Sequence, residues 1–438
     1  QGIYYHWLSS SSPTMYFEQI SYRLKGKGIQ INLIEETFQH LINRHAILRT
    51  SFTNDYAGIP LQIVRKKVDA NFKYLALSET IMNSDINSYV HDFKKVDREK
   101  GFDLNTGSQM RLTVLELGDD EFEFIWSHHH ILMDGWCVSI LINEFYELLN
   151  SHEPKLPVSN SLQYSNYIKW LEQFDEKFSK NYWKNYLLGY SDVAKIPFKN
   201  EKLKSQIYIP CKESIRIETD QFESITELCS NIGITQNIFI QGVWGYLLSN
   251  YNNTQDVVFG SVVSGRPPHL FDIENMIGLF INTIPVRVKY SKTDTPISLL
   301  KELQNHFIAG TPHHYLNLSE VQSQSEIGKD LINHIMIFEN YPVQETLNLD
   351  LRKNESQKGN KLEVHSIDTV ERTNYPFEIL ITSTASSMSI NFKYDGAIFS
   401  RSLIHNLVRH FEILISQFCD YPNEKLLSLN YLSKEEEK

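Results

Sequence analysis

The sequence predicts a mixed α/β protein built from two lobes, and three observations carry this prediction. The chain has 438 residues, whereas a single domain usually holds roughly 100–200. Its apolar content of 41% and its 14 prolines are typical of a folded globular protein. Segments with the period of a strand alternate with segments that have the period of a helix. We place the lobes at residues 1–175 and 176–438, because a polar-aromatic helix followed by Gly189 and prolines separates two patterned halves.

The first lobe begins with strand-like and helix-like segments in alternation. Residues 17–24 alternate with a period of two, and apolar residues between 34 and 42 recur at helical spacing. Asn32 and Glu35 resemble a capping box at the start of that helix. Two alternating runs joined by "GDD" predict a β-hairpin. In chain order we expect a strand at 17–24, a helix at 32–42, a strand at 46–52, a hairpin over 109–127 and a helix at 138–150.

The second lobe shows the same mixture of patterns. Apolar runs such as "VVFGSVV", "FINTIPVRV" and "HIMIF" predict buried strands. Helical spacing of apolar residues predicts helices around 240–248 and 403–414, the latter preceded by a hairpin. We therefore expect α/β architecture in both lobes.

Charge and cysteine content exclude several classes of function. The net charge of −11 argues against a nucleic-acid surface, because phosphate binding needs a concentrated basic field. The four cysteines form no CxxC pair, so neither a disulfide framework nor a thiolate zinc site is expected, and a reducing cytoplasm is the expected location. The sequence contains no run of 18 or more apolar residues, so no membrane-spanning helix is expected.

Ten residues, "SHHHILMDGW" (127–136), concentrate side chains that can carry chemistry. Metal binding is the weakest of three interpretations, because zinc ligands must converge and adjacent residues of an extended chain point to opposite faces. The imidazoles could instead be structural, with Asp-Gly closing an ordinary turn. The third interpretation is catalytic, since a strand leads into the turn and a helix follows Gly135, which would hold a histidine on a rigid edge. Strand parity groups Trp126, His128 and His130 on one face but does not choose the base.

The same residues carry a resemblance to a known family. "HHILMDG" (129–135) matches the HHxxxDG motif of the condensation domains of nonribosomal peptide synthetases. Five further segments resemble the family's motifs in the family's order. They are "RHAILRTSF" (44–52), "YSNYIKW" (164–170), "GSVVSGRP" (260–267), "IGLFINTIPVRV" (277–288) and "NYPFE" (374–378). The resemblance covers nearly the whole chain.

The resemblance implies a fold and a reaction. The fold would be two lobes, each similar to chloramphenicol acetyltransferase, in a V-shaped pseudo-dimer with a central tunnel. The enzyme would be an amide-forming acyltransferase that makes peptide bonds in antibiotic biosynthesis. In that reaction the α-amine of an acceptor aminoacyl thioester attacks the carbonyl of a donor aminoacyl or peptidyl thioester. Both substrates would hang from the 4′-phosphopantetheine of carrier proteins, and the domain itself would bind no cofactor.

The resemblance also implies partners. These would be an upstream donor and a downstream acceptor peptidyl carrier protein, together with an adjacent adenylation domain. The form "HHILMDGWC" is similar to that of members that join an L-configured donor to an L-configured acceptor. The chain starts at Gln1 without methionine and ends on "SKEEEK", so we expect a piece of a larger multidomain chain.

By the family's pattern, one imidazole would face the substrates. His130 is that residue, either as the general base or as the group that positions the amine and the developing charge. Gly135 would offer its backbone N–H near the oxyanion. His129 would pack away from the channel and hold the turn.

The family's pattern assigns supporting roles to other residues. Asp134 would be structural and would pair with an arginine from another segment. Arg287 is the first candidate for that arginine and Arg49 the second. Ser264 and Asn374 would line the substrate channel.

Two alternative functions belong to the same fold. An epimerisation-type relative would need a second acid–base group, and a non-catalytic domain that docks carrier or tailoring proteins would tolerate decay of the histidine motif. The intact motif and the "INTIPVR" strand favour condensation. A second pair, His313 and His314, lacks an Asp-Gly turn; histidines near a predicted helix end are more often capping or surface groups, and we assign this pair no role.

Overall fold

The computed structural model describes residues 2–9, 14–55, 58–77, 85–150, 163–196, 208–339, 363–432 and 436. The chain splits into two compact units. The first comprises residues 1–173, 266–280 and 341–374, and the second comprises residues 174–265, 281–340 and 375–438. No helix in the described part of the chain is both long and apolar enough to cross a membrane.

The first unit is assembled from distant parts of the sequence. Its first break, between Gln173 and Phe174, lies close to the division expected after residue 175, but two later segments return to this unit. One reason is strand β11 (Glu363–Val370), which pairs antiparallel with β1 (Phe17–Lys25). Hydrogen bonding between strands that lie so far apart in the chain leaves no trace in local periodicity, so the sequence patterns did not reveal it.

The first unit contains a five-stranded sheet in the order β11-β1-β6-β5-β4. The hairpin predicted over residues 109–127 is confirmed, because β5 and β6 pair antiparallel through a turn with positive φ angles at Asp119 and Asp120. A separate two-stranded sheet pairs β2 with β3. The remaining strands of the unit are β4 (Phe72–Ala76), β5 (Met110–Gly118), β6 (Glu121–His129), β2 (Thr50–Thr53) and β3 (Leu61–Val64).

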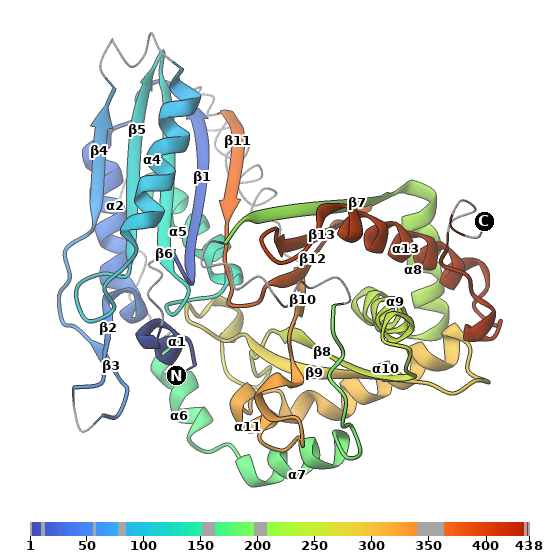
Figure 1. Cartoon of the computed structure of the whole chain (residues 1–438). Helices are drawn as coiled ribbons and strands as arrows, with labels where there is room; N and C mark the ends of the chain where they lie inside the picture. Colours follow the sequence, from blue (N-terminus) through green and yellow to red (C-terminus); the bar gives the residue numbers. More distant parts are fainter. Residues whose placement is uncertain are drawn as a thin grey trace. The chain divides into compact units, whose positions relative to one another are not determined.

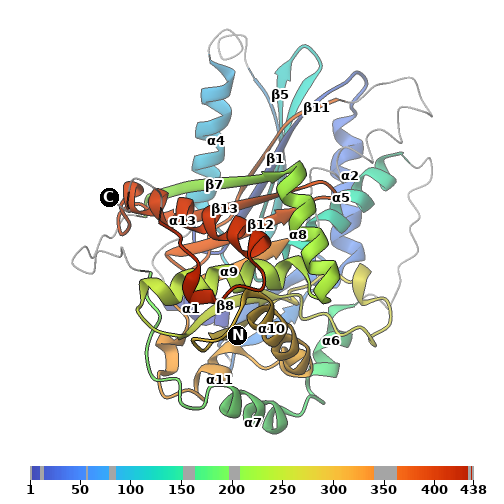
Figure 2. The ribbon, with the colours of Figure 1, turned by 90° about the vertical axis from the view of Figure 1, so that its right-hand side faces the viewer.

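Helices cover both faces of the five-stranded sheet, with α4 on one face and α2 and α5 on the other (Figures 1 and 2). The predicted helix at 32–42 is α2, but its first residues form no capping box, since Gln30 occupies the cap without a side-chain hydrogen bond. Residues 46–49 form a short 3₁₀ helix ahead of β2, where a strand was expected. The helices are α1 (Gly2–Ser9), α2 (Ile31–Arg44), η1 (Ala46–Arg49), α4 (Ile86–Lys100), α5 (Gly135–Asn150), α6 (Tyr164–Leu171) and η3 (Ile273–Asn275).

Alternation along β1 and β6 separates an apolar face from a polar one. Tyr22 and Trp126 belong to the core beneath α2 and α5. Gln19 and Ser127 lie on the other face, where both hydrogen-bond to Asp97 of α4 at 2.9 and 2.6 Å. Because one face of the sheet is apolar and the other is polar, residues along β1 and β6 alternate with a period of two, and this alternation is visible in the sequence.

The second unit contains a six-stranded mixed sheet in the order β7-β13-β12-β10-β8-β9. Figure 1 shows α8, α9, α10 and α13 gathered on one face of it. Its strands are β7 (Pro210–Glu218), β8 (Asp256–Val263), β9 (Asn282–Lys289), β10 (Ile335–Glu339), β12 (Phe377–Ser383) and β13 (Ser387–Asp395). Its helices are α7 (Glu176–Tyr186), α8 (Thr219–Ile232), α9 (Gln236–Tyr251), α10 (Pro296–Gly310), η4 (Thr311–His313), α11 (Leu318–Gln322), η5 (Gly328–Leu331), α13 (Arg401–Asp420) and η6 (Leu426–Ser428).

Both faces of the second sheet are buried. On β8, Val257 and Phe259 join the large core under the four helices, whereas Val258 joins a smaller core with residues of α7 and α11. This explains why the strands of this unit appear in the sequence as continuous apolar runs. The mixed α/β prediction is confirmed in both units, while the V-shaped arrangement and the central tunnel stay predictions.

Candidate active site

Three consecutive histidines end in the turn after β6, and they differ in exposure. His128 and His129 are buried, with exposed fractions of 1% and 2%. The side chain of His130 is 16% exposed. Strand parity predicted that His128 and His130 lie on the same face. The contacts agree, because both rings lie within ion-pair distance of Glu18, the residue of β1 that stands opposite His128. His130 is therefore the most exposed of the three rings.

The ring of His130 is held at one nitrogen. Its Nδ1 donates a hydrogen bond to the carbonyl of Met133 at 2.8 Å, and the backbone N–H of His130 donates to the carbonyl of Tyr16 at 2.8 Å. A proton on Nδ1 leaves the lone pair of the neutral ring on Nε2. Nε2 has no hydrogen-bond partner among the residues that the structure describes. The geometry thus presents a basic nitrogen that is free to accept a proton.

The charge around His130 favours its protonated form. Burial alone would lower the pKa of His130, but the negative charge of Glu18 and the hydrogen bond to Met133 outweigh it and raise that pKa above its ordinary value. Burial would raise the pKa of Glu18, yet the nearby imidazoles of His130 and His128 hold it well below its usual range. An ionised Glu18 facing an imidazole that readily takes a proton is an arrangement suited to proton transfer.

His129 has a different environment. Its Nδ1 accepts a hydrogen bond from the backbone N–H of Ile131 at 3.1 Å. Burial, assisted by the neighbouring imidazoles, lowers the pKa of His129 to about 3. The ring is therefore neutral near pH 7 and is tied to the turn itself, which supports the holding role predicted for it.

Asp134 is buried within the turn, and its partners come from residues 266–280. Its Oδ2 accepts a hydrogen bond from the backbone N–H of Phe280 at 3.1 Å. Its Oδ1 accepts one from the thiol of Cys137 at 3.2 Å and lies 3.4 Å from the guanidinium of Arg266. These contacts support a structural role for Asp134.

The predicted arginine partners of Asp134 are wrong. Arg287 pairs with Asp256 through hydrogen bonds of 2.8 and 2.6 Å. Arg49 donates to the backbone carbonyl of Ile42 at 2.9 Å, at the end of α2. Each guanidinium therefore satisfies acceptors beside its own strand or turn, and the carboxylate of Asp134 pairs with Arg266.

Arg266 belongs to the "GSVVSGRP" motif, in which only Ser264 was predicted as a site residue. Its side chain is 8% exposed. It donates to the carbonyl of Met276 at 3.0 Å, and its guanidinium lies 4.0 Å from the ring centroid of Phe280. A planar guanidinium satisfies a carboxylate, carbonyls and an aromatic face at once, which a lysine would not do.

Helix α5 is held in place behind the turn. Arg44 and His45 of the "RHAILRTSF" motif both pair with Glu144 of α5, at 3.3 and 2.6 Å. Gly135 is the first residue of α5, so its backbone N–H has no acceptor within the helix. This N–H and the positive end of the helix dipole are suited to a developing oxyanion, as predicted for Gly135.

The "YSNYIKW" motif supports the segment that holds Asp134. The hydroxyl of Tyr164 donates to the carbonyl of Leu279 at 2.6 Å. The ring of Tyr164 covers Gly278 so closely that a Cβ there would lie 2.0 Å from a ring carbon. Tyr164 and Tyr167 also pack against Phe280. The motifs "YSNYIKW", "GSVVSGRP" and "IGLFINTIPVRV" thus all help to hold the turn that contains Asp134.

The two predicted channel residues lie at strand ends. Ser264 directly follows β8, and Asn374 precedes β12; both are exposed. Their role in lining a channel stays a prediction. Among the described residues, no group of three or more histidines, cysteines, aspartates or glutamates could hold a metal ion.

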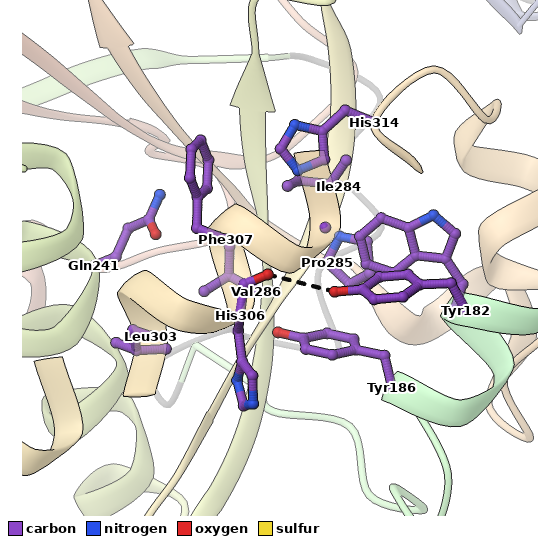
Figure 3. A pocket seen from close by; sticks show the side chains of 12 residues that line it. Tyr182, Tyr186, Gln241, Ile284, Pro285, Val286, Leu303, His306, Phe307 and His314 are labelled. Carbon is purple, nitrogen blue, oxygen red and sulfur yellow. Dashed lines mark hydrogen bonds between the residues drawn. The ribbon is translucent and has the colours of Figure 1, made fainter. Parts of the chain in front are cut away.

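His313 and His314 are buried, so the general tendency of histidines near a helix end to be capping or surface groups does not hold here. His313 shares a hydrogen bond with Ser179 at 2.9 Å, and burial lowers the pKa of His314 to about 4. His314 lines a small aromatic cavity in the second unit (Figure 3), in which the hydroxyl of Tyr182 donates to the carbonyl of His306 at 3.3 Å. The helical turns that carry these histidines pack into a core.

Sequence reasoning missed Glu18 as well as Arg266. Glu18 stands in a strand whose other even-numbered residues, such as Ile20 and Tyr22, are apolar and buried. An acid on the apolar face of a strand was the available signal. Its partner could not be named without the register that sets it opposite His128.

The mixed α/β fold and a turn of the HHxxxDG type, with the second histidine partly exposed and the aspartate buried, define the class of protein. A model of the Condensation domain family matches residues 1–438, and the chain belongs to this family. Condensation domains of nonribosomal peptide synthetases catalyse amide-bond formation. The resemblance stated from the motifs is thereby confirmed.

Relatives support the same assignment. The chain is 33% identical over 446 residues to bacitracin synthase 1 of Bacillus licheniformis, and the match covers 100% of the chain and 8% of that protein. It is 32% identical over 438 residues to surfactin synthase subunit 3 of Bacillus subtilis (strain 168), covering 100% of the chain and 34% of the relative. The chain thus spans 8% and 34% of these two proteins.

Solved structures share the fold. A four-domain nonribosomal peptide synthetase bound to AMP and glycine superposes with a TM-score of 0.80 at 18% identity, over 100% of this chain and 34% of that one. An X-domain from teicoplanin biosynthesis, solved in complex with OxyB, gives 0.80 at 18% identity, over 98% and 94%. Since both superpose equally well, the discrimination between functions depends on the site residues.

Proposed function

We propose that this chain forms an amide bond between a donor aminoacyl or peptidyl thioester and the α-amine of an acceptor aminoacyl thioester. One observation carries the proposal. His130 is partly exposed, keeps its Nδ1 proton on the Met133 carbonyl and leaves Nε2 without a partner in the described part of the chain. The family membership of the chain supports the same reaction.

The chemistry demands modest basicity and good positioning. An α-amine has a reference pKa of about 7.7–8.0, so a large fraction is neutral near physiological pH. Orientation of the two reactants can contribute about 7–11 kcal/mol. The amine nitrogen attacks the thioester carbonyl, Nε2 of His130 accepts the amine proton, and the C–S bond then breaks. The imidazolium returns this proton to the leaving sulfur, so a thiol leaves on the donor arm and the amide stays on the acceptor arm.

We further propose the setting of the reaction. Both substrates are carried on 4′-phosphopantetheine arms, by an upstream donor and a downstream acceptor carrier protein, beside an adenylation domain in a larger synthetase. The "HHILMDGWC" form supports an L-donor and an L-acceptor. The four cysteines are free thiols, which supports a reducing cytoplasm.

One experiment tests the proposal against its two alternatives. The protein is mixed with donor-loaded and acceptor-loaded carrier proteins, and the products are followed by mass spectrometry with chiral analysis. Dipeptidyl thioester on the acceptor carrier is the expected result. A change in stereochemistry without elongation would identify an epimerising relative, and binding without either product would identify a docking domain; each would overturn the proposal.

A further inference from the structure

Glu18 is a buried acid beside the proposed active histidine. It lies on β1 directly opposite His128, and its exposed fraction is 6%. One carboxylate oxygen lies 2.8 Å from Nε2 of His128, and the other lies 3.3 Å from Nδ1 of His130. The two oxygens thus face two different imidazoles.

We propose that Glu18 is a positioning residue of the condensation reaction: its negative charge beside Nδ1 favours the Nδ1–H tautomer that the Met133 carbonyl accepts from, and it stabilises the imidazolium that forms when His130 accepts the amine proton. This inference rests on the proposed function and deepens it. A carboxylate also stands beside Nδ1 of the imidazole in serine-protease triads, but here the Nδ1–H hydrogen bond goes to the Met133 carbonyl and Glu18 acts through its charge.

Because Glu18 is buried, its negative charge requires a partner nearby. A carboxylate out of water needs a partner of opposite charge or strong hydrogen bonds. Among the residues that the structure describes, the groups within ion-pair distance of Glu18 are the imidazoles of His128 and His130, and no lysine or arginine is among them. The imidazoles of His128 and His130 are therefore the groups beside Glu18 on which a positive charge can form.

The other charged groups around His130 do not replace Glu18. The charge of Asp134 acts on His130 more weakly than that of Glu18 and is engaged by Arg266 and backbone N–H groups. The charge of Glu371, which follows β11, also acts more weakly than that of Glu18. His129 is neutral because burial lowers its pKa to about 3. Glu18 is thus the strongest electrostatic partner of His130.

His128 completes the arrangement from the opposite strand. It is 1% exposed and does not reach solvent, so a direct role in binding substrate is excluded. Its Nε2 lies 2.8 Å from the carboxylate oxygen that does not face His130. Ion-pair contacts on both oxygens restrict the rotation of the carboxylate and favour the orientation in which one oxygen faces Nδ1.

The test compares Glu18→Gln with the unaltered protein by two readouts. The first is the pKa and tautomer of His130 in ¹⁵N-histidine-labelled protein, with the His130 signals assigned from a His130→Gln spectrum. The second is the pH profile of condensation with carrier-loaded substrates. We expect the glutamine variant to lower the pKa of His130 by about one pH unit or more and to lower kcat about 10–100-fold, with the KM for the acceptor within about twofold. The acid limb of the profile moves to lower pH with the pKa.

Controls separate positioning from folding. Glu18→Asp keeps the charge and is expected to restore most of the pKa of His130. Glu123→Gln removes a buried acid from the same strand as His128, where it pairs with Arg23 at 3.2 Å, and is expected to leave that pKa unchanged. If Glu18→Gln does not fold, the pKa and tautomer of His130 are measured in the unaltered protein alone. A His130 pKa below the ordinary value of about 6.5, or a neutral ring protonated at Nε2, overturns the inference.

The outcomes also separate this inference from the proposed function. A folded Glu18→Gln protein with an unchanged His130 pKa and an unchanged pH profile overturns the role of Glu18, even when His130→Ala abolishes condensation. Full activity of His130→Ala overturns the proposed function instead.

Discussion

Arg266 and Asp134 form a buried ion pair that ties residues 266–280 to the histidine turn, at 3.4 Å between the guanidinium and Oδ1. The pair is accompanied by the Cys137 thiol, which lies 3.2 Å from the same carboxylate oxygen and 3.1 Å from Arg266. The turn that presents His130 is therefore held by a charge that arrives from 132 positions further along the chain.

Breaking this pair from either side should destabilise the protein. Asp134→Ala or Arg266→Ala leaves one buried charge without its partner, and we expect each to lower the free energy of unfolding by about 3 kcal/mol. Urea denaturation of the two single variants and the double variant measures the coupling. The double variant should cost clearly less than the sum of the singles.

Arg49 supplies the matched control for that cycle. Its guanidinium binds backbone carbonyls at the end of α2, away from Asp134. Arg49→Ala combined with Asp134→Ala should therefore be additive in the free energy of unfolding. Strong coupling in this cycle, together with additivity for Arg266, would reverse the assignment of the partner.

His130→Ala should remove most of the condensation activity. Positioned proton-transfer groups contribute roughly 10²–10⁴-fold, so turnover should fall at least about 10²-fold. His405→Ala is the control, because that ring is 64% exposed on α13. Equal turnover of a folded His130→Ala protein and the His405→Ala control would contradict the role of His130.

A methyl group at Gly278 should disturb the same turn by a steric route. Its Cβ would lie 2.0 Å from the ring of Tyr164, and we expect Gly278→Ala to lower the free energy of unfolding by about 1–3 kcal/mol. Gly2→Ala, where nothing lies within 4 Å, is the control. In a Tyr164→Ala background the cost of Gly278→Ala should shrink; an equal cost in both backgrounds would show that the ring is not the obstacle.

Local patterns predicted most of the elements but not the long-range partners. The alternation along β1, β5 and β6 arises because each face of the sheet meets a different environment, and a period of two records that difference. The same parity grouped His128 with His130. Arg266, Glu18 and β11 escaped prediction for one reason: each acquires its role from a segment distant in the chain, and nothing in its own neighbourhood encodes the register that brings them together.

The wrong prediction of Arg287 as the partner of Asp134 shows why local patterns do not predict long-range partners. Arg287 lies in the "IGLFINTIPVRV" segment, and Asp134 was expected to pair with an arginine from another segment. Arg287 satisfies Asp256 on the neighbouring strand β8, where Val258 is its register partner. Arg287 lies on a strand and pairs with an acid on the neighbouring strand. Asp134 instead pairs with Arg266, an arginine in the segment that follows β8.

Buried neutral histidines should make the protein sensitive to acid. Burial lowers the pKa of His334 to about 3 and that of His314 to about 4. Because these folded-state values lie below the unfolded value of about 6.5, the unfolded chain binds more protons between the two limits. The stability they contribute is fully present above pH 6.5 and is lost as the pH falls toward 4, at up to about 1.4 kcal/mol per pH unit for each histidine.

His334 allows this acid sensitivity to be tested by a single substitution. Its Nε2 accepts a hydrogen bond from the indole N–H of Trp244 at 3.0 Å. Glutamine can accept the same bond but does not titrate, so in His334→Gln the free energy of unfolding should depend less steeply on pH between 6.5 and 4. The measurement is urea denaturation at several pH values, with the exposed His405→Gln as control. The same slope in both variants would mean that His334 is protonated in the folded protein, because only a histidine that stays neutral while buried binds an extra proton on unfolding.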